Sequence, residues 1–570
     1  MTGISNLSYA RQPDAREKIA VLLPMLRSFF QEAVQGLTAR CARSGTLDVE
    51  RFEYWQESSY QLALSSAELA AAQCLFDRWD LLQGPLERRL ALVSIVETLP
   101  SVATRLERVF LDIDANDDRQ RLYQWMANDV VATLRGEVIG AAALAETGRL
   151  LVAHEGAIGE PPLSEELAMA RDAFQRLARE RVAPLAEAIH REDLTVPEAL
   201  LQPLRELGLF GLSVPTRYGG SADDGSDDNL MMLVVTEALS EVSLGGAGSL
   251  ITRPEILTRA LLAGGTEDQK AHWLPRIANG EPLCAIAITE PDYGSDVAGL
   301  ALRATPVEGG WRLNGTKTWC TFAGKAGLLL VIARTDPDRS KGHRGLSAFL
   351  VEKPSFDGHD FAVGGERDGR LTGRAIATIG YRGMHSFELA FEDYFVPADH
   401  LIGGENGLGK GFYLTMTGMM GGRLQTAGRA CGVMRAALGA AVQYSRDRRV
   451  FGEPLAAYPL TLGKLTRMAG CYLACRQLAY AVAADLTTPA GRRLASQAKL
   501  LACRGAETVT REALQLHGGM GYAEEMPVSR YFVDARVLSI FEGAEETLAL
   551  KVIARGLLEE ALREGDDDVG

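Results

Sequence analysis

The chain has 570 residues, of which 47% are hydrophobic and 24% are charged, and its formal net charge is −14. This length predicts three or four domains, because an average domain has roughly 150 residues. The acidic balance argues against nucleic acid or an anionic membrane as the main partner, since both are themselves negatively charged.

The cysteines and the first residues indicate the compartment. The eight cysteines include no CxxC pair, and the closest two, Cys471 and Cys475, are one helical turn apart. We therefore expect reduced, mostly buried thiols, with no disulfide and no zinc or other metal site. Residues 1–18 contain no apolar run of signal-peptide length, and no segment approaches the roughly 18 apolar residues of a membrane span. We expect a cytoplasmic protein.

Helical patterns cover residues 16–150. The stretches 49–79 and 119–151 are apolar-periodic, so each predicts a long helix, and the clearest break between them is Pro100. Glycines and a Pro-Pro pair then predict a linker at 153–167, with Ser164 as the cap of the next helix. Helical signals resume after this linker and continue to about residue 275.

The period changes after residue 281. Asn314–Gly315 separates two short alternating runs and predicts a hairpin, and further strands are predicted at 326–336, 344–354 and 385–397. After Pro397 the helical pattern returns. Its small-residue stripe, suited to close helix packing, consists of Ala430, Met434, Ala437, Ala441 and Tyr444. The predicted order is helical (1–155), helical (164–280), β (281–397) and helical (398–560).

Four motifs could bind a ligand, and each also has an ordinary structural explanation. ITEPDYGSD (288–296) offers hydroxyls and N–H groups, but turn chemistry explains its composition equally well. In TKTWCTF, Lys317, Trp319 and Thr321 share one face of a predicted strand, where Trp319 could form a wall for a planar ring or fill a core. QLHGGMGY (515–522) could approach a ligand or cap a helix. SRDRRVFG (445–452) could bind pyrophosphate or complement a helix dipole.

Two nucleotide-binding patterns are not supported. GENGLGKG (404–411) has Gly411 where a P-loop needs Ser or Thr, and it does not follow a core strand. No GxGxxG follows a strand, so a Rossmann domain is not predicted. His517 has no carboxylate or cysteine partner in the sequence, and we assign it no catalytic role.

Taken in order along 164–560, seven motifs resemble those of the acyl-CoA dehydrogenase family: ITEPDYGSD, NGTKTWCTFAG, FEDYFVP, GGR, RDRRVFG, QLHGGMGY and FEGAEE. The resemblance implies a mainly α fold with a helical domain, a β-barrel-like middle domain and a C-terminal four-helix bundle, here extended by the N-terminal helical domain 1–155. It also implies FAD as cofactor, an acyl-CoA substrate, electron-transfer flavoprotein as electron acceptor, and a homodimer or homotetramer.

The resemblance assigns the FAD contacts residue by residue. Those to the flavin of the same subunit are Ile288, Thr289, Ser295, Trp319, Thr321 and Glu546. Those to the FAD of a neighbouring subunit are Arg448, Phe451, Gln515, Gly518 and Gly519. The chain departs from the family pattern at Ala544, Pro459 and Val533, which would weaken individual cofactor contacts.

Three glutamates crowd the stretch SIFEGAEETLALKVIAR (539–555), where a helix is predicted from about Ala544. A preference for acidic residues at helix N-termini explains Glu545 and Glu546 better than Glu542. The resemblance implies that Glu542 is the catalytic base, which removes the α-proton while the Gly543 N–H polarises the thioester carbonyl. It further implies that the β-hydrogen leaves as hydride to flavin N5, to which Thr321 would hydrogen-bond.

The N-terminal extension, together with AIATIGYRGMHSFELAF (375–391), resembles the branch of the family that oxidises (2S)-methylsuccinyl-CoA to mesaconyl-CoA in the ethylmalonyl-CoA pathway. The free carboxylate of that substrate needs a cation in a buried pocket. The candidates are Arg253, Arg382 and, less specifically, Arg423, although an ordinary ion pair is the alternative for each. Ser295 and Gly543 complete the expected substrate contacts.

Other functions stay open. The substrate could be another short or branched acyl-CoA of the isovaleryl, butyryl or glutaryl type, or the enzyme could pass electrons directly to oxygen as an oxidase. A non-catalytic CoA-binding relative is a further alternative. The N-terminal domain shows no catalytic set of residues, and we interpret it as a packing, oligomerisation or pocket-covering element.

Overall fold

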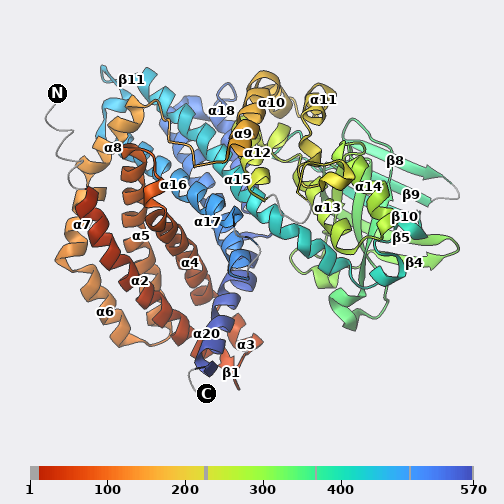
Figure 1. The fold of residues 1–570 in the computed structure, drawn as a ribbon, viewed down its shortest axis with the longest axis horizontal. Helices are drawn as coiled ribbons and strands as arrows, with labels where there is room; N and C mark the ends of the chain where they lie inside the picture. The colour runs from red at the N-terminus through yellow and green to blue at the C-terminus, as the bar shows by residue number, and fades with distance from the viewer. Residues whose placement is uncertain (1–11, 224–228, 366–368, 485, 487–488, 568–570) are drawn as a thin grey trace. The chain divides into compact units, whose positions relative to one another are not determined.

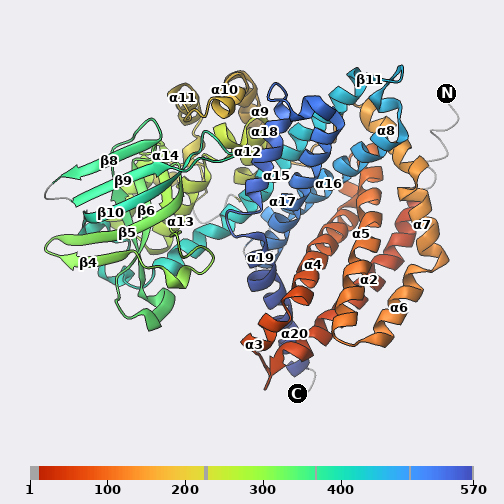
Figure 2. The same ribbon diagram turned by 180° about the vertical axis from the view of Figure 1, so that it is seen from behind.

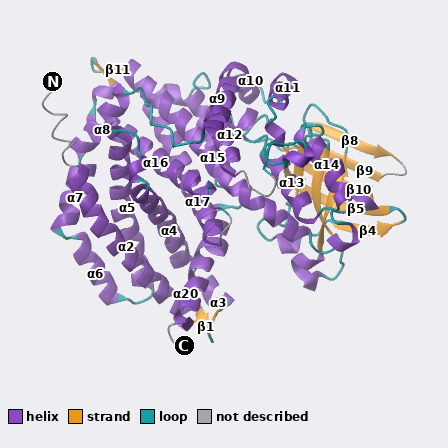
Figure 3. Cartoon of the chain, in the orientation of Figure 1, coloured by secondary structure: helices purple, strands orange, loops and turns teal. Residues whose placement is uncertain are grey.

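The computed structural model describes residues 12–223, 229–365, 369–484, 486 and 489–567. The chain forms two units, one made of residues 1–164 with 426–570 and the other of residues 165–425 (Figure 1). Helices predominate, and a curled mixed sheet lies in the second unit (Figure 3). No targeting segment is predicted in residues 1–18. Residues 1–11 of this stretch lie outside the described residues.

No helix in the described part of the chain is both long enough and apolar enough to cross a membrane.

The N-terminal part of the first unit is helical, as predicted. Its helices are α2 (Gln12–Cys41), α3 (Val49–Tyr54), α4 (Gln56–Asp77), α5 (Pro85–Asp112), α6 (Asn116–Met126), α7 (Asp129–Ile139) and α8 (Ala141–Ala153). A two-stranded ladder, β1 (Ala42–Arg43) with β2 (Thr46–Leu47), connects α2 to α3. The two predicted long helices are each divided, the first at Trp55 and the second at Asn128 and Gly140.

The predicted break at Pro100 is wrong. Pro100 lies inside α5, which continues to Asp112. Leu99, Val102 and Leu106 beside it are completely buried, so the packing of this helix outweighs the loss of one backbone N–H at the proline.

The C-terminal helices complete the first unit. They are α15 (Gly411–Asp447, which begins in the second unit), α16 (Pro459–Ala483), α17 (Pro489–His517), α18 (Pro527–Leu538), α19 (Glu545–Thr547), the π-helical segment η12 (Leu548–Ala554) and α20 (Arg555–Asp567). The predicted small-residue stripe of α15 is buried at its four alanine and methionine positions. A short ladder, β11 (Arg449–Val450) with β12 (Glu453–Pro454), precedes α16.

The N-terminal helices pack directly on the C-terminal ones within this unit. α4 packs against α16 and α17, and α5 packs against α16 (Figure 2). Gly148 of α8 faces α16 so closely that an added Cβ would lie 2.5 Å from the Leu462 carbonyl oxygen. Two hydroxyl groups tie the helices further, since Ser94 donates to the Gly470 carbonyl at 2.7 Å and Thr466 donates to the Leu144 carbonyl at 2.8 Å.

The second unit begins with helices and continues into the sheet. The helices are α9 (Glu165–Leu177), α10 (Ala183–Arg191), α11 (Glu198–Glu206), α12 (Asn229–Val242), α13 (Thr252–Gly264) and α14 (Glu267–Ala278), with a glycine-rich π-helical turn, η5 (Leu244–Gly248), before α13. The strands are β3 (Cys284–Ala287), β4 (Arg303–Val307), β5 (Gly310–Thr321), β6 (Leu328–Arg334), β7 (Leu346–Glu352), β8 (Asp360–Gly365), β9 (Gly369–Ala375) and β10 (Ser386–Pro397).

The sheet has the order β3-β6-β4-β5-β10-β9-β8, and β7 also pairs with β6. Strand β6 is buried on both faces, which explains its continuous apolar run. Leu329 and Val331 contribute to the core enclosed by the strands, whereas Leu328 and Leu330 pack against the helices α13 and α14. The helices therefore cover one face of this part of the sheet.

The predicted hairpin at Asn314–Gly315 is wrong, because both residues lie inside β5 and the turn comes earlier, between Val307 and Gly310. The Asn-Gly pair instead serves a β-bulge. The pairing of β5 with β10 skips a register between Phe391 and Tyr394, and Gly315 has φ +136° there. The Asn314 side chain accepts a hydrogen bond from the Asp393 backbone N–H at 2.9 Å, which closes the bulge.

A second irregularity in β5 separates Lys317 from Trp319. The register against β10 shifts again between Phe387 and Leu389, and Trp319 has φ +56°. Lys317 is completely buried while Trp319 is 55% exposed, so the expectation that both side chains share one face is wrong. Strict alternation along a strand fails where a bulge inserts an extra residue.

The buried Lys317 ammonium pairs with Glu290. Lys317 Nζ donates to Glu290 Oε1 at 2.8 Å and to the Ile288 carbonyl oxygen at 2.7 Å. The Glu290 carboxylate also accepts the backbone N–H groups of Ala301 and Leu302 at 2.7 and 2.9 Å. Burial lowers the pKa of the Lys317 ammonium, and the Glu290 charge opposes that shift. This pair fixes the 288–302 loop against β5.

We expect Glu290→Gln to destabilise the protein by about 3–5 kcal/mol, because it leaves a buried ammonium without its counter-charge. In the folded variant the Lys317 side chain would be mostly the neutral amine, whereas in the unfolded variant it would be the cation. The unfolded state would therefore bind more protons than the folded state. The deficit should therefore shrink as the pH rises from neutrality toward the unfolded lysine pKa of about 10.4. Thermal unfolding from pH 7 to 10 measures this. Glu308→Gln, at an exposed position, is the control, and a melting temperature equal to that of the wild type would refute the role of the pair.

Candidate active site

The expected flavin contacts of the second unit meet at one end of β5. The Thr318 backbone N–H donates to the Thr289 carbonyl at 2.8 Å, so the 288–289 segment lies beside the strand that carries Trp319 and Thr321. The Thr321 hydroxyl is 2.9 Å from the Ser386 hydroxyl at the start of β10. Trp319 presents a large aromatic surface to the exterior of this unit, next to a hydroxyl. This arrangement suits a planar ring with a polar edge.

Ser295 lies on the exposed side of the same loop. Glu290 and Tyr293 exchange backbone hydrogen bonds at 3.0 and 3.1 Å, which closes the turn that contains Pro291. The turn chemistry proposed for this motif is therefore present, and it holds Ser295 next to a loop that Glu290 anchors. Ile288 and Thr289 lie beside the part of β5 that carries Trp319 and Thr321, and their role as flavin contacts stays a prediction.

Arg253 and Arg382 also belong to the second unit, and they differ in their partners. Arg253, near the start of α13, is only 5% exposed. Its guanidinium donates to the Ser249 carbonyl at 2.8 Å and to the Tyr381 hydroxyl at 3.2 Å. Among the described residues it forms no ion pair. A buried guanidinium without a carboxylate partner is energetically costly unless a ligand supplies the negative charge.

Arg382 is already engaged within the protein. It donates to the carbonyl oxygens of His190 and Thr378 at 2.9 and 3.3 Å, and its Nε lies 3.4 Å from Asp193 Oδ1. Its segment packs against η5, where an added Cβ on Gly245 would come within 2.2 Å of the Arg382 carbonyl oxygen. Arg423 lies half-buried in α15. The contacts of these arginines favour Arg253 as the one available to an anionic group.

In the first unit, Glu542 stands in a strained loop between α18 and α19. Its φ is +54°, a left-handed conformation that is uncommon for a residue with a side chain. Its Oε2 atom is buried and has no hydrogen-bond partner among the described residues. The next residue, Gly543, has φ +96°, which glycine adopts readily. The loop thus holds a carboxylate whose buried oxygen is not used by the protein itself.

The side chain of a buried lysine fixes this loop by hydrogen bonds. Lys499 of α17 is 1% exposed, and its Nζ donates to the carbonyl oxygens of Phe541 and Gly543 at 2.8 and 2.5 Å. These carbonyls flank Glu542 on both sides. The Arg429 guanidinium lies 4.8 Å from the centre of the Phe541 ring. The strained conformation of Glu542 is therefore fixed by its neighbours, and its side chain remains available.

Glu545 and Glu546 have the structural roles that their position suggested. They begin α19, one residue later than the predicted start at Ala544, which is the N-cap. Glu545 forms an ion pair with Arg504 and accepts a hydrogen bond from the Tyr60 hydroxyl. Glu546 is exposed. The N-terminal extension thereby contacts the residue that stands three positions after Glu542.

The residues assigned to a neighbouring subunit's FAD all lie in the first unit and are exposed. Arg448 directly precedes β11, and Phe451 lies in the turn between β11 and β12, where it is 98% exposed with φ +50°. Gln515, Gly518 and Gly519 lie at the end of α17. The Tyr444 and His517 rings stack with their centres 4.2 Å apart, which joins the ends of α15 and α17.

Sequence reasoning did not identify Lys499, Arg504 or Tyr60. Each lies on a long helix in a pattern that resembles an ordinary amphipathic surface. One signal was present, since Lys499 stands between Ala498 and Leu500 at a position where helical periodicity places buried residues. A charged residue on a buried helical face needs a polar partner, and the carbonyls of the Glu542 loop supply it.

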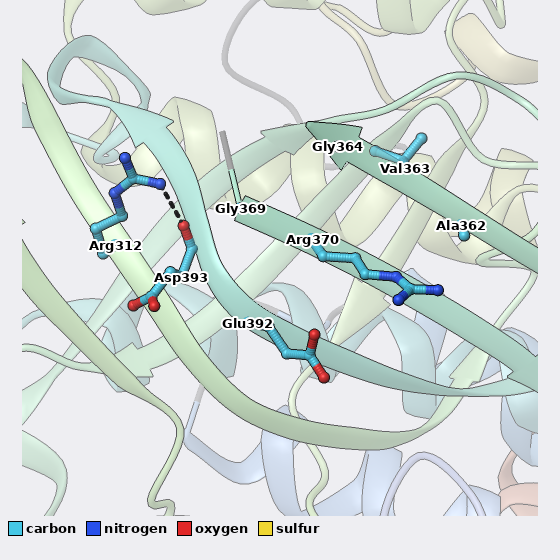
Figure 4. A pocket seen from close by; sticks show the side chains of 8 residues that line it. All are labelled: Arg312, Ala362, Val363, Gly364, Gly369, Arg370, Glu392 and Asp393. Carbon is cyan, nitrogen blue, oxygen red and sulfur yellow. Dashed lines mark hydrogen bonds between the residues drawn. The ribbon is translucent and has the colours of Figure 1, made fainter. Parts of the chain in front are cut away.

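A separate pocket lies at the far edge of the sheet. It is bordered by β5, β8, β9 and β10, and Figure 4 shows Arg312 donating to the Asp393 carbonyl oxygen beside Glu392 and Arg370. None of the residues assigned to the flavin, the substrate or catalysis lines it. We therefore build no part of the active site on this pocket.

Comparison with known proteins agrees with the geometry. Three family models match in order: the acyl-CoA dehydrogenase N-terminal domain at residues 164–281, the middle domain at 285–394 and the C-terminal domain at 409–558. A (2S)-methylsuccinyl-CoA dehydrogenase of Cereibacter sphaeroides is 42% identical over 405 residues, covering 70% of this chain and 71% of that protein.

Solved structures show the same likeness. The butyryl-CoA dehydrogenase of Megasphaera elsdenii has a TM-score of 0.63 and 31% identity, covering 70% of this chain and 100% of that chain. A structure described as an electron transferring flavoprotein of Acidaminococcus fermentans has a TM-score of 0.62 and 30% identity, covering 71% and 99%. With three domain models matched in order and these relatives over most of their length, the chain belongs to the acyl-CoA dehydrogenase family.

Proposed function

We propose that this enzyme binds FAD and dehydrogenates an acyl-CoA thioester between its α- and β-carbons, with Glu542 as the base. The observation that carries the proposal is the Glu542 loop, in which a strained backbone and a buried lysine present a carboxylate with an unpaired buried oxygen. A carboxylate free of protein partners can accept a proton from a bound substrate.

The residues of the two units supply complementary functions. Thr289, Trp319 and Thr321 offer the aromatic surface and hydroxyls that fit an isoalloxazine ring, as the exposed Trp319 beside the Thr321–Ser386 pair indicates. FAD, when bound, supplies the acceptor for the hydride that leaves the β-carbon. Glu542 takes the α-proton, and the Gly543 N–H donates to the thioester carbonyl as negative charge develops there. Loss of the proton and the hydride leaves a carbon–carbon double bond in the product.

The substrate that we favour is (2S)-methylsuccinyl-CoA, with mesaconyl-CoA as the product. Two observations support it: the 42% identity to a methylsuccinyl-CoA dehydrogenase, and the buried Arg253 without a carboxylate partner among the described residues. A dicarboxylic acyl group would supply that carboxylate. A neutral short-chain substrate is the second candidate, because a butyryl-CoA dehydrogenase also matches.

The remaining assignments follow from the family. Arg448, Phe451, Gln515, Gly518 and Gly519 bind the FAD of a neighbouring copy in a homodimer or homotetramer, and their exposure leaves them accessible to it. Electron-transfer flavoprotein reoxidises the flavin. We place the protein in the cytoplasm, where its cysteine thiols would stay reduced. The four-domain division of the chain, with residues 1–155 as an added helical domain, is part of the same proposal.

We expect Glu542→Gln to keep the bound flavin but to lower kcat by about 100- to 10,000-fold, because the amide cannot accept the α-proton. Flavin absorbance and steady-state turnover measure the two effects separately. Glu564→Gln, at an exposed position of α20 that is assigned no contact to cofactor or substrate, should retain nearly full turnover. Substantial turnover in the Glu542 variant would exclude it as the base.

Lys499→Met should lower kcat while leaving the KM for the thioester and the flavin content almost unchanged. The methionine fills a similar volume but donates no hydrogen bond, so the 541–543 loop loses the contacts that fix Glu542. Positional errors of this kind cost about 10- to 100-fold in rate. Lys464→Met, which removes a half-buried ion pair of α16, is the control. If kcat is preserved in Lys499→Met, the lysine does not position the base.

Arg253→Gln should reduce kcat/KM for methylsuccinyl-CoA by about 100-fold, the value of a charge-assisted bond of 2–3 kcal/mol, but change that for butyryl-CoA only slightly. Arg382→Gln is the matched comparison, since Arg382 already has partners within the protein. The kinetic constants of both substrates are measured for both variants. Equal losses for the two substrates in Arg253→Gln would remove it as the carboxylate partner, and a selective loss in Arg382→Gln would transfer that role.

A further inference from the structure

Two histidines and an aspartate from three separate segments converge in the second unit. Asp193 follows the end of α10, His359 precedes β8 and His385 precedes β10. The two Nε2 atoms are 3.1 Å apart, His385 Nε2 lies 3.0 Å from Asp193 Oδ1, and His359 Nε2 lies 3.7 Å from Asp193 Oδ2. One potential ligand atom of each residue therefore lies within 4.8 Å of the other two.

The protons available to this cluster cannot satisfy all three contacts separately. An imidazole Nε2 either carries one hydrogen or presents one lone pair, and both lie along the same direction. If His385 Nε2 accepts from His359, its lone pair faces the Asp193 carboxylate without a proton between them. If His385 Nε2–H donates to Asp193, the same hydrogen would have to be shared with His359 Nε2. A cation among the three atoms satisfies every lone pair at once.

The spacing matches a metal ion. Tetrahedral zinc with bonds of about 2.0–2.1 Å places neighbouring ligand atoms about 3.3 Å apart. The 3.1 Å between the two Nε2 atoms and the 3.0 Å between His385 Nε2 and Asp193 Oδ1 are close to that value, and His359 Nε2 lies 3.7 Å from the other carboxylate oxygen, Oδ2. His385 is 6% exposed, whereas the side chains of His359 and Asp193 are about half exposed. One ligand is thus fixed in the interior, and the other two border solvent, from which an ion can enter.

The ligand atoms and the neighbouring arginine indicate which kind of ion would bind. Arg382 Nε lies 3.4 Å from Asp193 Oδ1 and orients that carboxylate while reducing its negative charge. Two nitrogen ligands and one partly neutralised carboxylate favour zinc, copper or nickel over calcium or magnesium, which prefer oxygen ligands.

We propose that Asp193, His359 and His385 form a binding site for one divalent transition-metal ion of the zinc class. The ion joins the end of α10 to the two loops that precede β8 and β10. His385 accepts a backbone hydrogen bond from Phe322 at 2.7 Å, and the next residue, Ser386, contacts Thr321 at 2.9 Å. Metal binding therefore stiffens the segment beside Thr321. The proposal stands independently of the substrate and of the role of Glu542.

The test uses the purified flavoprotein, stripped with EDTA, desalted and titrated with zinc chloride against a chromogenic chelator. Bound zinc per chain is then measured by elemental analysis. We expect the wild type to bind one zinc more than His359→Ala, which should weaken this site by 10-fold or more. His343→Ala is the matched control, because His343 has the Tyr413 hydroxyl as its partner and no carboxylate. Asp193→Asn, which keeps the side-chain shape, should repeat the loss.

A second readout does not depend on counting metal. Zinc at 100 times its Kd should raise the melting temperature of the wild type by about 2–5 °C, and magnesium should not. His359→Ala should lose this response while remaining folded, since His359 lies near the surface. Equal zinc binding in the wild type and His359→Ala would place the metal elsewhere. No zinc above the level of His359→Ala and no thermal shift would show that the cluster is only a hydrogen-bonded triad. Either result overturns the proposal.

Discussion

The Lys317–Glu290 pair is the interaction on which the second unit's part of the site depends. It joins a buried strand to a loop that would otherwise have only turn chemistry to shape it. Because Glu290 also accepts two backbone N–H groups at the far end of that loop, one carboxylate fixes both ends of the segment. A buried ion pair is a weak source of net stability, but it allows very few alternative arrangements. The Lys317–Glu290 pair therefore contributes conformational specificity at Thr289 and Trp319.

A buried lysine also fixes a loop in the first unit. Lys499 is buried like Lys317, and it donates to the backbone carbonyls on either side of Glu542. The left-handed backbone at Glu542 persists because these hydrogen bonds and the glycine after it both support that conformation. In this loop one oxygen of the Glu542 carboxylate has no hydrogen-bond partner among the described residues.

The sequence predicted the fold class, including the sheet in the middle of the chain, because periodicity and residues close together in the chain determine these features. The roles assigned to the site motifs stay predictions. It failed where a backbone irregularity or a distant partner decided the outcome. Asn314–Gly315 has the composition of a turn, but Asp393 on a neighbouring strand converts it into a bulge. Pro100 does not end its helix, because burial of the flanking residues compensates. The choice between Arg253 and Arg382 required knowing that Asp193 lies beside only one of them.

The contact between Tyr60 and Glu545 has a consequence for any shortening of the chain at its N-terminal end. Tyr60 comes from the N-terminal extension, and Glu545 starts the helix that follows the Glu542 loop. Burial and the neighbouring Glu545 carboxylate raise the pKa of the tyrosine hydroxyl to about 12, so it keeps its hydrogen and can donate it to Glu545 at physiological pH. Removal of the extension would take this donor away and leave Arg504 to hold the Glu545 carboxylate. The segment after Glu542 would then lose one of the contacts that order it.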